Sequence, residues 1–268
     1  MEFCPIASGS GGNCVYLGTA AARILVDAGL SGVRVERALA SLNISPLSLR
    51  GIFLTHEHGD HILGAGVLAR RYNVDIYATE GTWDYIERTR VLGKLRPEQK
   101  RVVCPGEDLD FGDMRIRPFI VSHDAASPVG YSFFFGGVKA TVATDLGYVD
   151  KNTAESISDS DILLIESNHD LDMLHNGPYP QHLKRRILSD KGHLSNVTCG
   201  QILTDLAHGL KHIYLGHLSA ENNDPLLAFE TVRDMLEVAN IPVNSPCGAG
   251  VSLYLADRDS ASKFLRLM

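Results

Sequence analysis

The sequence predicts an α/β protein (α+β arrangement) in which two mixed β-sheets pack face to face and helices cover their outer sides, a four-layer αββα sandwich. Composition and element order lead to this fold class. The chain has 268 residues, 44% hydrophobic and 21% charged, which is ordinary for a globular protein and excludes a disordered one. In each half, strand-like runs come first and helical periodicity follows. The length suits a single domain over residues 1–268, built from two similar halves.

The strand-like runs are short, apolar and bounded by glycine or polar residues. We expect strands at 3–7, 15–18, 23–27, 52–54, 74–78, 129–135, 138–143, 162–165, 213–215 and 251–255. Apolar residues at helical spacing predict helices at 33–42, 62–72, 82–91, 180–188, 196–208 and 225–238. The glycine-rich turn at 8–13 lacks the Lys-Ser/Thr ending of a nucleotide-binding loop, so a plain hairpin turn is favoured over a phosphate cradle.

Charge and cysteine usage narrow the class of protein. Lys and Arg number 25 against 32 Asp and Glu, a formal charge of −7, which argues against a general nucleic-acid coat but allows a local basic groove. No apolar run approaches the ~20 residues of a membrane span, and the N-terminus does not read as a signal peptide. The cysteines are odd in number and form no CxxC pair, which predicts reduced thiols in a cytoplasmic protein: Cys4, Cys14, Cys104, Cys199 and Cys247.

The strongest motif is a cluster of His56, His58, Asp60 and His61 directly after the strand at 52–54. Imidazole and carboxylate groups at this density suit two adjacent divalent ions of the zinc or manganese type. Gly59 permits the sharp turn that would direct these side chains to one point. A polar loop with incidental histidines is the disfavoured alternative.

Three further candidate ligands each follow a strand-like run, namely His123, Asp145 and His217. Any one of them alone would be interpreted as a hydrogen-bonded structural residue. Together with the cluster they make a set of seven ligands, which is enough for two metal ions that share one carboxylate.

These motifs resemble those of the metallo-β-lactamase superfamily, in order and in their position at strand ends, across essentially the whole chain. The resemblance implies an αββα sandwich with two metals at the edge of the sheets. It implies that His56, His58 and His123 hold one metal, that Asp60, His61 and His217 hold the other, and that Asp145 bridges them. It also implies that a water or hydroxide between the metals is the nucleophile, its pKa lowered toward ~7 by the metal charge.

The ligand pattern resembles the phosphodiesterase and nuclease branch of that superfamily more than its lactamase branch. The segment Ile165–Asn168 is similar to the Glu segment of ribonuclease Z, and the segment 192–196 is similar to its His segment. This likeness implies that Glu166 orients His193 and that His193 acts as general acid, so both join Asp60 among the candidate catalytic residues. The alternative for His193 is capping of the helix that starts near Ser195.

Four segments make the chain similar to the YycJ/WalJ family of bacterial proteins: 7–14, 166–170, 192–196 and 216–223. That family is regarded as 5′→3′ DNA exonucleases linked to mismatch repair, which implies DNA, double- or single-stranded, as substrate and repair proteins as partners. His169 has no ligand counterpart in ribonuclease Z. A functional role, either a phosphate contact or assistance at the metal edge, and a hydrogen-bonded structural role are equally open for it.

Basic residues gather in two places that would bind a phosphate backbone. The stretch 85–104 contains Arg88, Arg90 and Lys94, and the second cluster, just before His193, contains Lys184 and Arg185. A solvated helix face is the alternative for both. About 70 residues separate Asp145 from His217, too few for the inserted domain of ribonuclease J and its DNA-processing relatives.

The sequence therefore favours a metal-dependent DNA exonuclease with two divalent ions, zinc or manganese with iron as an alternative. A second hypothesis is a phosphodiesterase or thioester hydrolase that acts on a small metabolite. A third is a binding protein without turnover, which the complete set of seven ligands disfavours. Oligomeric state cannot be read from the sequence.

Overall fold

A computed structural model describes residues 1–246 and 248–267. The chain divides into two compact units. The first unit comprises Met1–Ile120, Ala125–Val138 and residues 257–267, and the second comprises Val121–Asp124 and residues 139–256 apart from 247.

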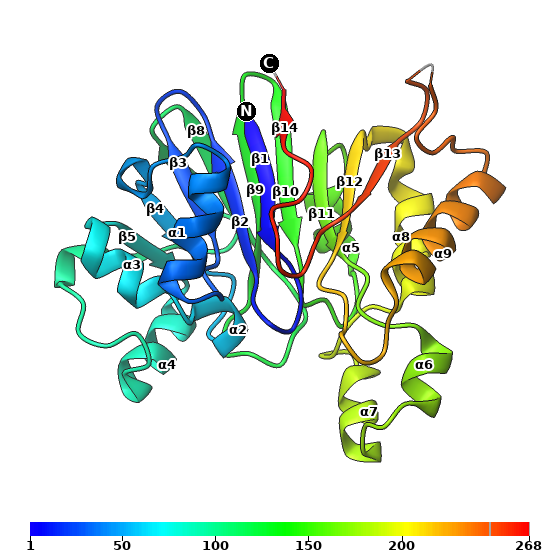
Figure 1. Cartoon of the computed structure of the whole chain (residues 1–268), viewed down its shortest axis with the longest axis horizontal. Helices are drawn as coiled ribbons and strands as arrows, with labels where there is room; N and C mark the ends of the chain where they lie inside the picture. The colour runs from blue at the N-terminus through cyan, green and yellow to red at the C-terminus, as the bar shows by residue number, and fades with distance from the viewer. Residues whose placement is uncertain (247, 268) are drawn as a thin grey trace. The chain divides into compact units, whose positions relative to one another are not determined.

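The first unit contains a seven-stranded sheet with the order β14-β1-β2-β3-β4-β5-β6. Strands β14 to β3 pair antiparallel, and β3 to β6 pair parallel. The strands are β1 (Glu2–Ala7), β2 (Cys14–Gly18), β3 (Arg23–Val26), β4 (Gly51–Phe53), β5 (Asp75–Ala78), β6 (Lys100–Val102) and β14 (Leu265–Arg266). Since β1 pairs with β14, the two ends of the chain meet in this sheet (Figure 1).

Helices cover one face of this sheet, and an antiparallel ribbon covers the other. Figure 1 shows α1 and α3 against the same face, where Val35 and Leu68 join the apolar core around Ile52. On the opposite face, Phe53 stacks on Tyr77 and meets ring edges of the ribbon. The helices are α1 (Gly32–Ser41), α2 (Gly59–Ile62), α3 (Ala65–Tyr72) and α4 (Glu80–Thr89), and the ribbon is β7 (Leu109–Phe111), β8 (Met114–Ile120) and β9 (Val129–Phe135).

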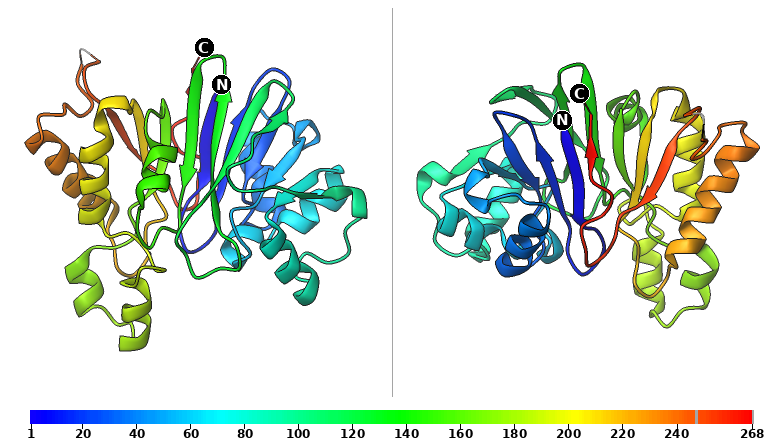
Figure 2. Two further views of the ribbon diagram at one scale, coloured as in Figure 1. Left: turned by 180° about the vertical axis from the view of Figure 1, so that it is seen from behind. Right: turned by 45° about the horizontal axis from the view of Figure 1, so that its top comes forward.

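The second unit is built on four parallel strands whose apolar runs are buried, as both-sided burial of a parallel sheet requires. They are β10 (Val138–Ala143), β11 (Ile162–Glu166), β12 (His212–Gly216) and β13 (Ser252–Leu255). The helices are α5 (Lys151–Ile157), α6 (Leu171–Asn176), α7 (Gln181–Ile187), α8 (Asn196–Leu206) and α9 (Pro225–Val238). Helices α8 and α9 pack together, and α6 and α7 lie side by side in every view (Figure 2). Because all four strands are parallel, the residues that follow them meet at one edge of the sheet.

The helix at 225–238 has the bounds expected from its periodicity, whereas the helix expected at 62–72 is divided. Gly64 separates α2 from α3, and a Cβ there would lie 2.3 Å from the carbonyl oxygen of Leu30. The sequence interpretation missed α5, α6 and β14. Each is at most 7 residues long, too short for periodicity to reveal.

Within the described ranges, no helix combines the length and apolar character that a bilayer crossing needs. Cys4, Cys14, Cys104 and Cys199 are free thiols, and Cys247 lies outside the described residues. The expectation of reduced cysteines therefore holds for these four.

Candidate metal centre

Three polar residues that follow strands adopt the left-handed backbone conformation. Asp27 follows β3 with φ of 58°, Asp145 follows β10 with φ of 59°, and His217 follows β12 with φ of 54°. For residues other than glycine this conformation costs about 1–2 kcal/mol, and it persists where surrounding contacts enforce it. In each case the turn places a polar side chain directly after its strand.

Neighbouring backbone fixes the histidine-rich loop of the first unit. Asn13, in the turn between β1 and β2, donates its backbone N–H to the carbonyl oxygen of Asp60 at 2.7 Å. Gly29 packs so closely that a Cβ would lie 1.6 Å from that same oxygen. The glycine-rich turn is the hairpin turn that the sequence favoured, and it also supports the candidate ligand loop.

Asp27 orients two histidines of this loop. Its Oδ1 accepts from the backbone N–H of Thr55 at 2.8 Å, and its Oδ2 accepts from the Thr55 hydroxyl and from His61 Nδ1, both at 2.8 Å. The Thr55 hydroxyl also lies 3.0 Å from His56 Nδ1. Burial raises the pKa of Asp27, and the contacts with His61 and Thr55 oppose that rise. The sequence interpretation missed Asp27, although it follows an apolar strand just as Asp145 does.

Because Thr55 contacts Nδ1 of His56 and Asp27 contacts Nδ1 of His61, the Nε2 atoms of both rings face the other candidate ligands of the loop. His56 Nε2 lies 2.9 Å from His58 Nδ1, and His61 Nε2 lies 3.6 Å from Asp60 Oδ2. Asn13 Nδ2 donates to His61 Nε2 at 3.0 Å. Two imidazole nitrogens this close together, with partners that fix their rings, are compatible with ligation of a divalent ion.

Glu57, the acidic residue inside the cluster, has a structural role. Its Oε1 accepts from the backbone N–H of Ala126 at 2.7 Å, and its Oε2 accepts from the Thr82 hydroxyl at 3.4 Å. Thr82 lies in the first turn of α4. Glu57 therefore ties the histidine loop to the start of that helix.

In the second unit, two histidines face one carboxylate oxygen. His123 Nε2 and His217 Nε2 each lie 3.6 Å from Asp145 Oδ1. This separation exceeds a hydrogen bond and leaves room for an ion between nitrogen and oxygen. Burial lowers the pKa of His123, which favours the neutral ring that binds metals.

Glu166 is fully buried and orients two more rings. Its Oε1 accepts from His193 Nδ1 and from His217 Nδ1, both at 2.7 Å, and its Oε2 accepts from the backbone N–H groups of Leu146 and Leu194. Burial alone would raise the pKa of Glu166, but His193 and His217 lower it well below its usual range. Burial works against the charged form of His193, yet Glu166 raises its pKa overall.

Helix capping is not the role of His193. Ser195 is the N-cap residue of α8, and its hydroxyl accepts from the backbone N–H of Thr198 at 3.1 Å. Ligand atoms of His193, His217, Asp145 and Glu166 all lie within 4.8 Å of one another. The structure thus brings His193 into the polar cluster of the second unit.

His169 is 1% exposed and does not lie on the protein surface. In the part of the chain that the structure describes, neither of its ring nitrogens has a hydrogen-bond partner. Burial lowers its pKa to about 4, so the ring is neutral. Protein atoms therefore do not supply the hydrogen-bonded structural role that the sequence left open.

The basic residues predicted to contact substrate differ in exposure. Arg88, Arg90, Lys94 and Arg185 are exposed, whereas Lys184 is buried. The amino group of Lys184 donates to the carbonyl oxygens of His175 and Gly177 at 2.6 and 2.8 Å. Its assignment to substrate binding therefore needs correction, because its charge stabilises the chain around the end of α6.

Comparisons with known proteins bear on both fold and family. A family model described as the beta-lactamase superfamily domain matches residues 22–217. The chain is 44% identical over 263 residues to Exodeoxyribonuclease WalJ of Streptococcus pneumoniae serotype 2, and the matched residues cover 98% of this chain and 96% of the relative. It is 44% identical over 262 residues to Exodeoxyribonuclease YycJ of Bacillus anthracis, with 97% and 96% covered.

Among solved structures, Zn²⁺-bound PqqB from Methylobacterium extorquens superimposes with a TM-score of 0.76 over 100% of both chains. At 16% identity this likeness concerns the fold alone. The predicted fold class and the family resemblance are both confirmed.

We expect Asp27→Asn to lower affinity for divalent metal about 10–100-fold, as loss of an outer partner of ligating histidines does. Asparagine tolerates the left-handed backbone, so the fold should survive. Graded chelator titration with metal analysis measures the affinity, and circular dichroism checks the fold.

Asp159→Asn is the matched control, since Asp159 is also an aspartate with positive φ, 53°, but is exposed. Equal metal affinity of the two variants would contradict the orienting role of Asp27.

Proposed function

The chain belongs to the metallo-β-lactamase superfamily and, within it, to the WalJ/YycJ family of exodeoxyribonucleases, and on that basis we propose that it degrades DNA from the 5′ end. The observation that carries this proposal is 44% identity across 98% of the chain to a relative named as an exodeoxyribonuclease. The proposal includes a cytoplasmic location, a single functional domain and a role in DNA repair beside repair proteins.

We propose that seven residues hold two divalent ions. His56, His58, Asp60 and His61 come from the first unit, and His123, Asp145 and His217 from the second, with the division between the ions that the family resemblance implies. The support within each unit is the set of partners that orients these side chains, Asp27 in one and Glu166 in the other. The donor set accepts zinc, manganese or iron.

When bound, two divalent ions supply Lewis acidity that activates water and offsets the charge developing on the phosphate. The protein's own contribution to bond cleavage is a proton. The side chain of His193 is 18% exposed, and its Nδ1 donates to Glu166. This leaves Nε2 to donate a proton to the departing 3′ oxygen, while Glu166 stabilises the protonated ring.

The proposal is tested with DNA labelled at either end. The purified protein, loaded with manganese or zinc, is incubated with 5′-phosphorylated duplex DNA, single-stranded DNA, RNA and bis(p-nitrophenyl) phosphate. Stepwise release of nucleotides from the 5′ end of DNA is expected. Hydrolysis of the small diester with no digestion of either DNA would favour the small-metabolite phosphodiesterase instead.

We expect Asp145→Asn to reduce activity more than His217→Asn, because a bridging carboxylate serves both ions and an imidazole serves one. The two variants are matched, since both positions have positive φ and asparagine tolerates that backbone. Initial rates on DNA and metal content per chain are measured together. Near-normal turnover with two ions bound in Asp145→Asn would refute the bridging assignment.

We expect His193→Ala to lower the maximal rate on DNA about 10²–10⁴-fold while metal content is unchanged. The loss should shrink on bis(p-nitrophenyl) phosphate, because p-nitrophenolate departs without a proton. Glu166→Gln should also lower the rate on DNA more than the rate on the small diester, and it should weaken metal binding as well, because Glu166 orients both His193 and His217. In His193→Ala, equal losses on both substrates would exclude the general acid, and loss of one ion would make His193 a ligand.

A further inference from the structure

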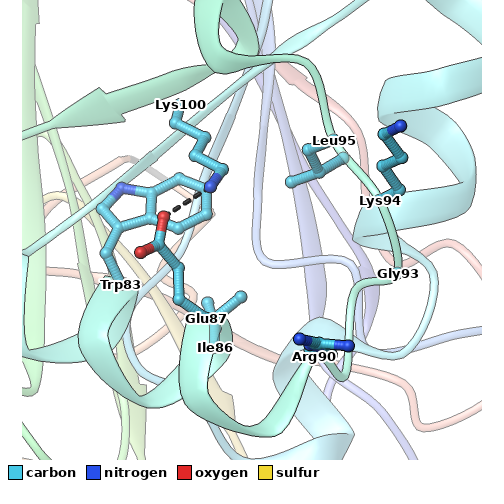
Figure 3. Close-up of a pocket in the computed structure, with 8 residues that line it drawn as sticks. All are labelled: Trp83, Ile86, Glu87, Arg90, Gly93, Lys94, Leu95 and Lys100. Atoms are coloured by element: carbon cyan, nitrogen blue, oxygen red, sulfur yellow. Dashed lines mark hydrogen bonds and ion pairs between the residues drawn. The ribbon is translucent and has the colours of Figure 1, made fainter.

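A pocket of about 520 Å³ opens on the first unit beside α4. Figure 3 shows Trp83, Ile86 and Glu87 of this helix and its C-cap residue Arg90, opposite Gly93, Lys94 and Leu95 and beside Lys100. Trp83, Ile86 and Glu87 follow the i, i+3, i+4 spacing of a single helix face. The volume lies in the range of sites for small organic ligands, roughly 300–1,000 Å³.

The pocket joins an apolar wall to a basic rim. Half-buried Leu95 supplies most of the apolar surface, together with the small exposed parts of Trp83 and Ile86, which are 5% and 3% exposed. The indole is fixed because its Nε1 donates to the carbonyl oxygen of Arg101 at 2.9 Å. Among the lining residues, Glu87 is the acid, and Lys100 pairs with it. Arg90 and Lys94 have no carboxylate partner in the part of the chain that the structure describes.

The loop after α4, which carries Gly93, Lys94 and Leu95 of the pocket wall, is held in place by its neighbours. The Arg70 guanidinium donates to the carbonyl oxygen of Leu92, and Gly66 packs so closely that a Cβ would lie 2.1 Å from that oxygen. Gln99 Nε2 donates to the carbonyl oxygens of Ala69 and Val74 at 2.7 and 3.2 Å. The pocket is therefore formed before any ligand arrives.

Helix α4 is also hydrogen-bonded to the histidine-rich loop of the first unit. Trp83 follows Thr82, whose hydroxyl donates to Glu57, and Glu57 stands between His56 and His58. A ligand against Trp83 therefore lies on the helix whose first turn is tied to that loop.

We propose that this pocket binds one unstacked nucleotide of single-stranded DNA. The base packs against Leu95 and the exposed part of Trp83, and the adjoining phosphates contact Arg90 and Lys94. An apolar wall with unpaired cations suits this ligand, since bases contribute through aromatic contact and phosphates through charge. The inference rests on the proposed function and adds to it a site that holds the strand away from the reacting bond.

The test uses the single tryptophan of the sequence, whose emission reports on the surroundings of Trp83. The metal-loaded protein is titrated with a hexathymidylate that carries phosphorothioate linkages against cleavage. We expect saturable quenching, and about tenfold weaker binding by a hexamer of the same charge without bases. The paired change Arg90→Ala with Lys94→Ala should weaken binding about tenfold and lower the salt slope by about 1.4, or 0.7 per phosphate contact.

Arg37→Ala is the matched control, an exposed arginine on α1 of the same unit, and should bind like the unaltered protein. Anisotropy of a labelled hexamer measures the same affinities without relying on Trp83. Equal binding of the abasic hexamer, or a paired variant that binds like Arg37→Ala, would overturn the proposal.

Digestion of DNA is measured in parallel to separate the two proposals. A protein that digests DNA but fails these binding tests refutes the pocket alone. A protein that passes them but digests no DNA refutes the exonuclease activity and leaves the pocket standing.

Discussion

The orientation of the candidate ligands depends on two buried carboxylates, because an ionised carboxylate is stable inside a protein only when hydrogen bonds satisfy it. Asp27 is 2% exposed and Glu166 is 0% exposed. Each accepts from backbone N–H as well as from histidine, so each binds a loop and its imidazole rings into one network. The requirement to satisfy a buried charge is what sets the direction in which His61, His193 and His217 point.

This constraint also bears on the strained backbone that follows β10 and β12. Asp145 and His217 follow β10 and β12, which extend in the same direction with β11 between them, and the left-handed turn after each strand brings both residues to Glu166 or its neighbours. Leu146, next to Asp145, donates its backbone N–H to Glu166 at 2.9 Å. The hydrogen bonds of one carboxylate thus offset the cost of two unfavourable backbone conformations.

Sequence patterns predicted the parts of this site that are local and left out the parts that depend on distant contacts. A dense histidine cluster after a strand, and polar residues at strand ends, are visible in the chain alone. The role of Asp27 is not, because it depends on hydrogen bonds to Thr55 and His61 far along the sequence. The prediction that Lys184 binds substrate was wrong for the same reason, since a basic run suggests phosphate contacts, whereas its amino group donates to a carbonyl oxygen of another helix. Short capped helices such as α6 were not predicted, because a capping aspartate leaves a weaker signal in the sequence than apolar periodicity does.

The pairing of surface charges limits how this acidic protein can hold a polyanion. Its formal charge is −7, so attraction to DNA must come from cations that carboxylates have not already neutralised. Several arginines are neutralised in this way: Arg101 pairs with Asp75, Arg115 and Arg117 with Asp108, and Arg186 with Asp124. Arg90 and Lys94 are different, and they stand beside the single tryptophan of the chain. In this pocket two cations contact few phosphates, so contact with the base must supply a larger share of the affinity, which suits an apolar pocket with a basic rim.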